Sequence, residues 1–111
     1  VSDPIYVSPA TRIERDLIPT EFALFQNYPN PFNPQTTIRF DQPTASDAIL
    51  MIYDTQGRLV RILVNDYLAI GVHNVIWDGR NDAGFAVTSG LYFYRITAGE
   101  NSEIRKMSLL K

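Results

Sequence analysis

The sequence predicts an all-β protein, an immunoglobulin-like antiparallel β-sandwich of about seven strands. Three observations lead to this prediction. Apolar residues recur at every second position in several short segments, and Gly, Pro, Asn and Asp gather between those segments. No segment of useful length has the helical period. Short strands separated by turn signals over about 90 residues are typical of this fold class.

The composition fits one small folded module. A chain of 111 residues with 45% hydrophobic and 20% charged residues can build one core and is too short for two ordinary domains. Its net charge of −2 gives no reason to expect a nucleic acid partner. There is no cysteine, so disulfides, thiolate metal sites and cysteine nucleophiles are excluded. Because the chain does not begin with methionine, we expect it to be part of a longer protein.

The chain is predicted to divide into a linker, residues 1–21, and a folded domain, residues 22–111. Three prolines and a charged run interrupt the first segment. Its one compact apolar cluster, Ile5–Val7, is a candidate for a short strand that docks on the domain.

The segment YPNPFNP, residues 28–34, predicts a rigid, extended corner. Its three prolines fix φ and lack backbone donors, so neither a helix nor a central strand can run through it. Asn30 and Asn33 each precede a proline and favour turns. Tyr28 and Phe32 supply apolar groups that we expect to hold the corner against the core.

The middle of the chain predicts two strands and a hairpin turn. Ile38 and Phe40 share one face of a half-buried strand. Both faces of Ala48–Tyr53 are apolar, which favours a central position in a sheet. Asp54–Gly57 then turns the chain, and Gly57 suits the left-handed position of such a turn.

The second half of the chain predicts four more strands and places its only Trp in the core. Trp77 and Tyr92 are expected to anchor the strands on either side of the Asp78–Gly84 turn. Asn65–Gly71 is predicted to be a loop. The predicted strands are Arg58–Val64, Val72–Asp78, Leu91–Thr97 and Glu103–Leu110.

The sequence gives little support for catalysis, and we expect a protein that is not an enzyme and needs no cofactor. His73 is the only side chain that could act as the base of a nucleophilic site, and it shares its predicted strand face with Trp77, which favours a packed or rim position. No GxSxG motif is present. Asp78 and Asp82 lie in one tight turn, where capping of the turn is favoured over glycosidase chemistry.

A calcium site and a sugar-binding surface are the open alternatives for a binding function. Counted from Asp78, the EF-hand pattern fails, although a looser site built from Asp78, Asn81 and Asp82 remains a candidate. Exposed aromatic residues could stack on sugars, but local core packing is favoured for them. The aromatic candidates are Tyr28, Phe32, Tyr67 and Phe85.

Five motifs, in order along residues 22–111, resemble the C-terminal sorting domain, type A, of the type IX secretion system. The part from WDGRNDAG to SGLYFY also resembles the Ig-like domain of flagellar hook-capping proteins. Ala48 and Arg105 depart slightly from the sorting-domain pattern. The motifs are YPNPFNPQTTIRF, IYDTQGRLVRILVN, GVHNVIWDGRNDAG, SGLYFYRITAG and RKMSLLK.

The resemblance implies an Ig-like targeting module for a secreted parent protein. Such a module would be recognised in the periplasm by an outer-membrane secretion translocon. A surface sorting peptidase would then cut in or before residues 1–21 and leave the N-terminal cargo domains at the cell surface. The recognition residues carried over from the family are Asn30, Pro31, Asp54, Gly57, Arg58, Gly90, Lys106, Met107, Leu109, Leu110 and Lys111.

The last strand is the part of the chain that we expect a partner to bind. Arg105 and Lys106 would add positive charge to an exposed strand edge, which suits a receptor and also weak self-association between copies. The alternatives are an accessory module that binds polysaccharide or calcium and a passive Ig-like spacer in a secreted hydrolase.

Overall fold

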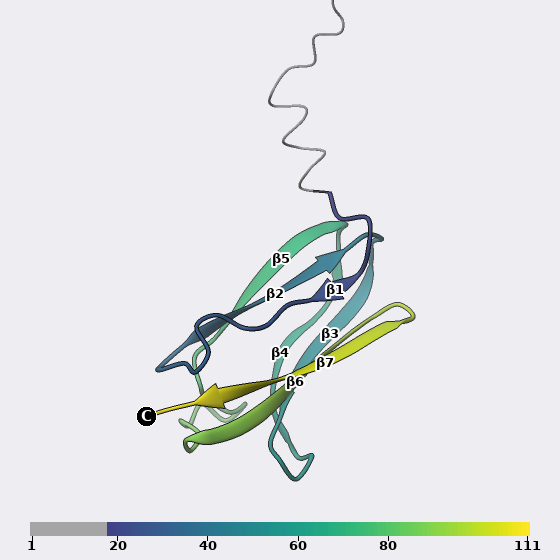
Figure 1. The fold of residues 1–111 in the computed structure, drawn as a ribbon. Coiled ribbons are helices and arrows are strands. Elements are labelled where there is room, and N and C mark those ends of the chain that lie inside the picture. The colour runs from purple at the N-terminus through teal and green to yellow at the C-terminus, as the bar shows by residue number, and fades with distance from the viewer. Residues whose placement is uncertain (1–17) are drawn as a thin grey trace, which may run out of the picture.

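The computed structural model describes residues 18–111 and shows two β-sheets packed face to face (Figure 1). The predicted all-β, Ig-like antiparallel sandwich is confirmed. The seven strands are β1 (Ala23–Leu24), β2 (Thr36–Gln42), β3 (Ser46–Tyr53), β4 (Leu59–Leu68), β5 (Gly71–Trp77), β6 (Gly90–Ala98) and β7 (Asn101–Leu109). The described part of the chain contains no helix that could cross a membrane. The predicted strand Ile5–Val7 and most of the predicted linker lie outside the described residues.

The two sheets have three and four strands. The smaller sheet has the order β1-β2-β5 and the larger one the order β4-β3-β6-β7. Every neighbouring pair is antiparallel. β3 lies between β4 and β6, which confirms the central position predicted from its apolar composition. Figure 1 shows that the described chain enters at one end of the sandwich and ends at the other.

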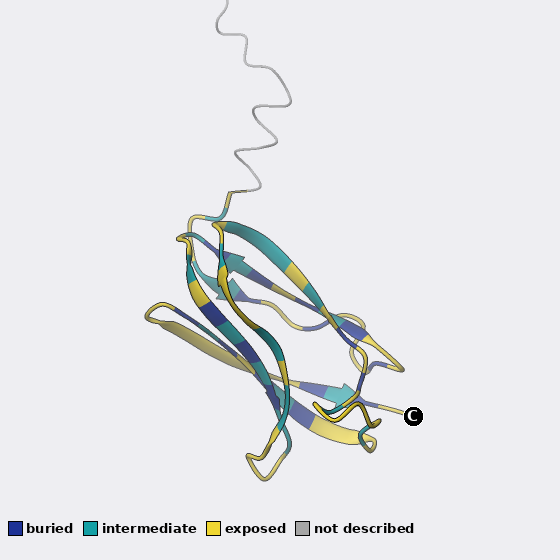
Figure 2. Cartoon of the chain, turned by 180° about the vertical axis from the view of Figure 1, so that it is seen from behind, coloured by how far each residue is buried: buried dark blue, intermediate teal, exposed yellow. Residues whose placement is uncertain are grey.

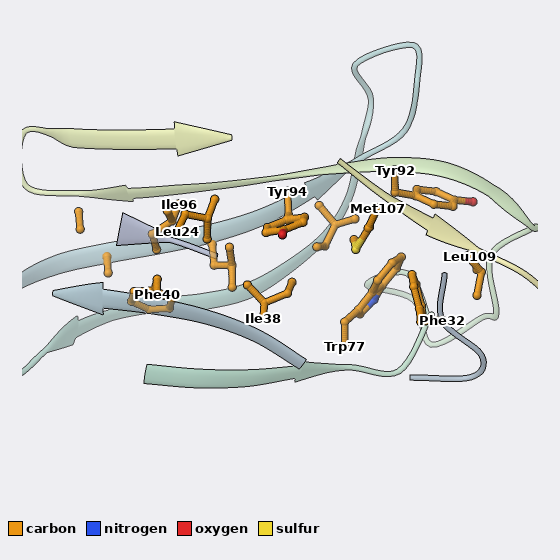
Figure 3. Packing of buried hydrophobic residues seen from close by; sticks show 14 residues of the cluster. Leu24, Phe32, Ile38, Phe40, Trp77, Tyr92, Tyr94, Ile96, Met107 and Leu109 are labelled. Carbon is orange, nitrogen blue, oxygen red and sulfur yellow. The ribbon is translucent and has the colours of Figure 1, made fainter. Parts of the chain in front are cut away.

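The core lies between the sheets and follows the period-two pattern of the strands. Ile38 and Phe40 of β2 are completely buried, and so is Trp77 at the end of β5. The Trp77 ring lies 5.5 Å from the Phe32 ring and 5.6 Å from the Tyr92 ring, measured between centroids, so it joins the corner to β6 (Figure 3). The predicted core positions of Trp77 and Tyr92 are confirmed.

One buried hydroxyl group fixes the segment that leads into the corner. The Tyr94 hydroxyl donates a hydrogen bond to the Phe25 carbonyl at 2.7 Å and accepts one from the Asn27 backbone N–H at 2.9 Å. Burial raises the pKa of this hydroxyl. The side-chain amide of Asn27, itself buried, donates to the Thr36 hydroxyl at 3.0 Å. The chain from Phe25 to Asn27 is therefore held on the core of the larger sheet.

Two local predictions are wrong. Asn65–Gly71 is not a loop along its whole length, because β4 continues to Leu68 and pairs with β3 as far as Ser46. The polar residues there are tolerated because β4 is an edge strand, so pairing with β3 overrides their low strand propensity. Tyr28 does not hold the corner against the core, since it is 80% exposed, whereas Phe32 is 1% exposed and does so.

Candidate recognition surface

The proline-rich corner lies against the last strand. The Phe32 backbone N–H donates to the Ser108 carbonyl at 2.9 Å, and the Leu110 N–H donates to the Phe32 carbonyl at 3.0 Å. Phe32 thus forms a parallel bridge with Leu109. The corner acts as a short extra strand beside the second half of β7, and the prolines that flank Phe32 leave its own N–H free to make this contact.

Side chains from the same N-terminal region close more of this edge. The Asn30 side-chain oxygen accepts a hydrogen bond from the Ser108 N–H at 2.9 Å, and the Gln26 amide donates to the Lys106 carbonyl at 2.8 Å. The Arg105 guanidinium donates to the Leu24 carbonyl at 2.6 Å. The expectation of an exposed strand edge is therefore wrong from Lys106 to Leu110, because the corner supplies the missing partners.

The predicted tail residues divide into buried and exposed groups. Met107 and Leu109 are each 1% exposed and belong to the core. Lys106, Leu110 and Lys111 are exposed. A partner that binds the folded domain can therefore touch the second group directly, whereas the first group positions the strand.

The Asp54–Arg58 hairpin is locked by one carboxylate. One oxygen of Asp54 accepts from the backbone N–H groups of Gln56 and Arg58, both at 2.9 Å, and the other accepts from the Arg58 Nε at 2.9 Å. These bonds, led by the one from the Arg58 backbone, lower the pKa of the Asp54 carboxyl. Gly57 has a φ of 81°, which confirms its predicted left-handed conformation. Arg58 remains exposed and cationic beside this locked turn.

The hairpin and Gly90 meet at one end of the sandwich. They line an open cleft of about 620 Å³, together with residues of the 81–89 loop. The Lys111 backbone N–H donates to the Ser89 hydroxyl at 3.0 Å, beside the same cleft. The structure thus places Asp54, Arg58 and Gly90 around one cleft. Asn30 and Pro31 lie instead beside the tail. The last residue of the tail, Lys111, lies between the corner and the cleft.

The Asp78–Gly84 loop uses its oxygen atoms to cap its own turn. The Asn81 side-chain oxygen accepts from the N–H groups of Ala83 and Phe85, both at 3.0 Å. Asp82 accepts from the Ile62 N–H at 3.2 Å, which ties the loop to β4. Turn capping, favoured from the sequence for Asp78 and Asp82, is seen for Asp78, which accepts a hydrogen bond from the Arg80 N–H at 3.1 Å. Within residues 18–111, no three His, Cys, Asp or Glu side chains form a group that could hold a metal ion.

Arg61 lies between the two carboxylates of the calcium candidate. Its guanidinium is 3.2 Å from an oxygen of Asp78 and 3.7 Å from an oxygen of Asp82. A calcium ion at that position would have to displace this cation, because the two positive charges repel. Asp78, Asn81 and Asp82 each have at least one side-chain oxygen with a protein partner.

His73 is packed at the rim of the core, as its strand position predicted. Its ring stacks on Phe40 with centroids 5.2 Å apart, and Nε2 lies 2.8 Å from the Ala69 carbonyl. Of the aromatic residues considered for sugar binding, Phe32 is buried, whereas Tyr28, Tyr67 and Phe85 are exposed. These three belong to separate loops and strands.

Several contacts between the corner and the tail have no signal in the sequence. Gln26 and Arg105 each contribute one side-chain atom, and Ser108 contributes its backbone N–H and carbonyl, to partners far away along the chain. Arg105 and Ser108 lie in the RKMSLLK motif, but neither that motif nor any periodicity indicates these partners. Only the repeated Asn-Pro pairs and the aromatic residue between them pointed to the corner.

The comparison with protein families gives one match that covers most of the chain. The model of the FlgD Ig-like domain matches residues 30–102. The basal-body rod modification protein FlgD of Salmonella typhimurium is 39% identical over 61 residues, which is 55% of this chain and 26% of that protein. The chain thus corresponds to about a quarter of the length of this relative.

Two solved structures from Porphyromonas gingivalis share the fold. Dimeric latent PorU superimposes with a TM-score of 0.64 at 22% identity, over 78% of this chain and 9% of PorU. PorZ, a surface component of the type IX secretion system, gives a TM-score of 0.56 at 21% identity, over 80% of this chain and 12% of PorZ. At these identities the likeness establishes the fold alone.

Proposed function

Because the chain belongs to the family of FlgD Ig-like domains, we propose that it is a non-catalytic Ig-like module, and specifically one that directs a secreted parent protein through the type IX secretion system to the cell surface. The observation that carries this proposal is the contact between the corner and the tail. Asn30 and the tail residues were assigned to recognition through different motifs of the same resemblance, and the hydrogen bond from Ser108 to Asn30 brings the two motifs together.

Two further observations are compatible with the export role. The family model matches residues 30–102, so the tail residues assigned to recognition lie beyond the matched range. The fold is also shared with PorZ, a type IX secretion component, and equally with FlgD of P. aeruginosa, so a sandwich of this kind occurs in both settings. In this proposal the partners are the outer-membrane translocon, the surface sorting peptidase and the cargo domains that precede residue 1. The module passes through the periplasm and reaches the cell surface.

A passive structural role is the second candidate. The 39% identity to Salmonella FlgD over 61 residues favours it, together with the match to the FlgD Ig-like domain. In such a role the domain would serve as a spacer, and its exposed tail residues would have no partner. The two candidate functions therefore differ in one respect. In the export role Lys106, Leu110 and Lys111 bind a partner, whereas in the spacer role their substitution changes only stability.

The test needs substitutions that leave the core intact. Deleting residues 105–111 is unsuitable, because it removes Met107 and Leu109 from the core and would unfold the domain. Leu110→Ser is better, since Leu110 is 56% exposed, and Ile76→Ser is a matched control at 58% exposure on another strand. A periplasmic reporter fused before residue 1 keeps the tail free, because the described chain begins and ends at opposite ends of the sandwich.

The readout is the amount of reporter on the surface of a bacterium that has type IX secretion, compared with a strain that lacks the translocon. We expect wild type and Ile76→Ser to reach the surface only with the translocon. Leu110→Ser combined with Lys106→Gln should reduce surface reporter by about fivefold or more, as for residues central to an interface. Equal export of all three proteins would argue against recognition by the tail. Retention of the wild-type fusion in the periplasm would favour the spacer.

A further inference from the structure

The outer face of the four-stranded sheet carries apolar side chains that no other part of residues 18–111 covers. Neighbouring residues of a strand point to opposite faces, so the residues between the buried positions of β3 and β6 point outward. Four large apolar residues of the larger sheet are well exposed: Ile104 at 54%, Leu59 at 48%, Leu91 at 39% and Ile62 at 38%. Figure 2 shows this alternation of buried and less buried residues along the strands.

The strand register arranges these side chains in two rows that cross all four strands. One row runs Ile62–Met51–Arg95–Ile104. The next runs Leu59–Tyr53–Phe93–Lys106. Each row therefore contains three apolar or aromatic residues and one cation. We call these eight residues the outer-face rows.

The two cations lie among apolar groups and have no anionic partner in the described part of the chain. The Arg95 guanidinium carbon lies 5.8 Å from the centre of the Tyr53 ring, and neither Arg95 nor Lys106 forms an ion pair with a carboxylate of residues 18–111. A groove of about 330 Å³ lies here, lined by Tyr53, Phe93, Arg95 and Ile104 and by Asp54, Thr55 and Gly57 of the adjacent hairpin. The Asp54 carboxylate at its rim is already paired with Arg58, at 2.9 Å from Nε. The groove is an apolar depression with a cation at its edge.

The outer face of the smaller sheet is different. Thr37, Arg39 and Asp41 of β2 and Asn74 of β5 point outward there, and Ile76 is the one large apolar residue of β5 that is well exposed. Arg39 is already neutralised, since its Nε lies 2.9 Å from an oxygen of Asp41. The smaller sheet thus presents a mainly polar surface with a paired cation, and the centre of its exposed Phe25 ring lies 4.3 Å from the Arg39 guanidinium carbon. The larger sheet presents an apolar surface with unpaired positive charge.

We propose that the outer-face rows are a docking surface for a protein whose contact surface is apolar and carries a carboxylate group that pairs with Arg95. The occupant is inferred from charge complementarity. An apolar surface alone would cover the aliphatic residues but would bury the guanidinium without a partner, which is costly, whereas a carboxylate offers Arg two parallel hydrogen bonds.

The same charges disfavour two other occupants of this face, a second copy of the chain and a lipid surface. A second copy docked through this face by two-fold symmetry would place the same cations close together, with no carboxylate among the outer-face rows to pair with them. A lipid surface is less favoured because the chain has a net charge of −2 and the apolar residues lie across a sheet rather than along an amphipathic helix. This inference does not depend on the export role. Lys106 is common to the outer-face rows and the tail, but Leu110 and Lys111 lie outside the rows, and the test below changes Arg95, which has no part in the export proposal.

The experiment is an NMR titration of the isotope-labelled protein with two synthetic peptides. One peptide is composed of Leu, Phe and Glu, and the other has Gln in place of each Glu. We expect the Glu peptide to shift the resonances of Met51, Phe93 and Ile104 and to bind about tenfold more tightly than the Gln peptide. Arg95→Gln should remove that difference, whereas Arg95→Lys should keep part of it. Arg39→Gln, on the other face, is the control and should bind like the wild type.

Three outcomes would overturn the proposal. The first is equal binding of both peptides, or no shift at the outer-face rows at millimolar peptide. The second is a concentration-dependent shift of the same residues without peptide, which would assign the face to a second copy. The third is binding to vesicles of anionic phospholipid that depends on Arg95, with no binding to the Glu peptide. Thermal unfolding of each variant shows whether it is folded before it is compared.

Discussion

The side-chain oxygen of Asn30 accepts a hydrogen bond from the backbone N–H of Ser108 at 2.9 Å, although the two residues are 78 positions apart in the chain. Asn30 lies between two prolines, so the corner holds its side chain in place without support from a regular strand. Through this bond and the neighbouring Phe32 contacts, the beginning of the domain closes the edge of its last strand.

Asn30→Ala should lower the free energy of unfolding by about 1 kcal/mol, because the Ser108 N–H loses its partner at a partly exposed site. Asn33→Ala is the matched control, since Asn33 also precedes a proline and is exposed. Chemical denaturation measures the change, and amide hydrogen exchange at Ser108 should become faster only in Asn30→Ala. Unchanged exchange at Ser108 would mean that the bond adds no protection.

Phe32→Ala should destabilise the domain by about 3–5 kcal/mol, because it opens a cavity beside Trp77 and removes the residue that fixes the corner. Phe85→Ala is the comparison, since Phe85 is 70% exposed. Its effect should stay within about 0.5 kcal/mol, as for a surface position. Both values come from urea unfolding followed by Trp77 fluorescence. Similar losses in the two variants would contradict the packing of Phe32.

Tyr94→Phe should cost about 1–3 kcal/mol, because it leaves the Phe25 carbonyl and the Asn27 N–H without their shared buried partner. Tyr53→Phe is the control, since the Tyr53 hydroxyl contacts only the Met51 sulfur, at 3.5 Å. Thermal unfolding of the two variants gives the comparison. A Tyr94→Phe protein as stable as Tyr53→Phe would show that water replaces the lost hydroxyl without cost.

Acid should destabilise the wild type partly through Asp54. Its carboxyl pKa is lower in the folded domain than the ordinary value of 3.8, so the folded state binds this proton less readily than the unfolded chain does. The stabilisation is therefore present above the ordinary pKa and is lost as the pH falls through the folded pKa. Urea unfolding at a series of acidic pH values should show a shallower loss of stability in Asp54→Asn. An identical slope in both proteins would argue against this role.

The period-two pattern was enough to predict most of the strands and the core. Ile38, Phe40 and Trp77 were placed correctly because burial on one face of a strand leaves a direct trace in the sequence. The apolar residues on both faces of β3 correctly indicated a central strand.

The contacts between distant segments could not be predicted in this way. Tyr28 and Phe32 occur in the same motif with similar apolar character, and only the direction of the chain in the corner decides that Phe32 is buried. The second half of β4 is a strand because β3 is beside it, and its own sequence favours a loop. The same limit holds for the recognition residues. Met107 and Leu110 are both large apolar residues of the tail, but Met107 is buried in the core and Leu110 is exposed.

The contacts that close the edge of β7 determine when the tail can take up its native shape. The exposed tail has its native shape only after the first residues of the domain have docked beside the last ones, so the shape is completed when the whole module has been made and has folded. A receptor that requires this shape would pass over a nascent, truncated or damaged chain even if it carried the same final residues. Recognition of the tail would then depend on folding, because the terminal residues are displayed correctly only when the domain before them is complete.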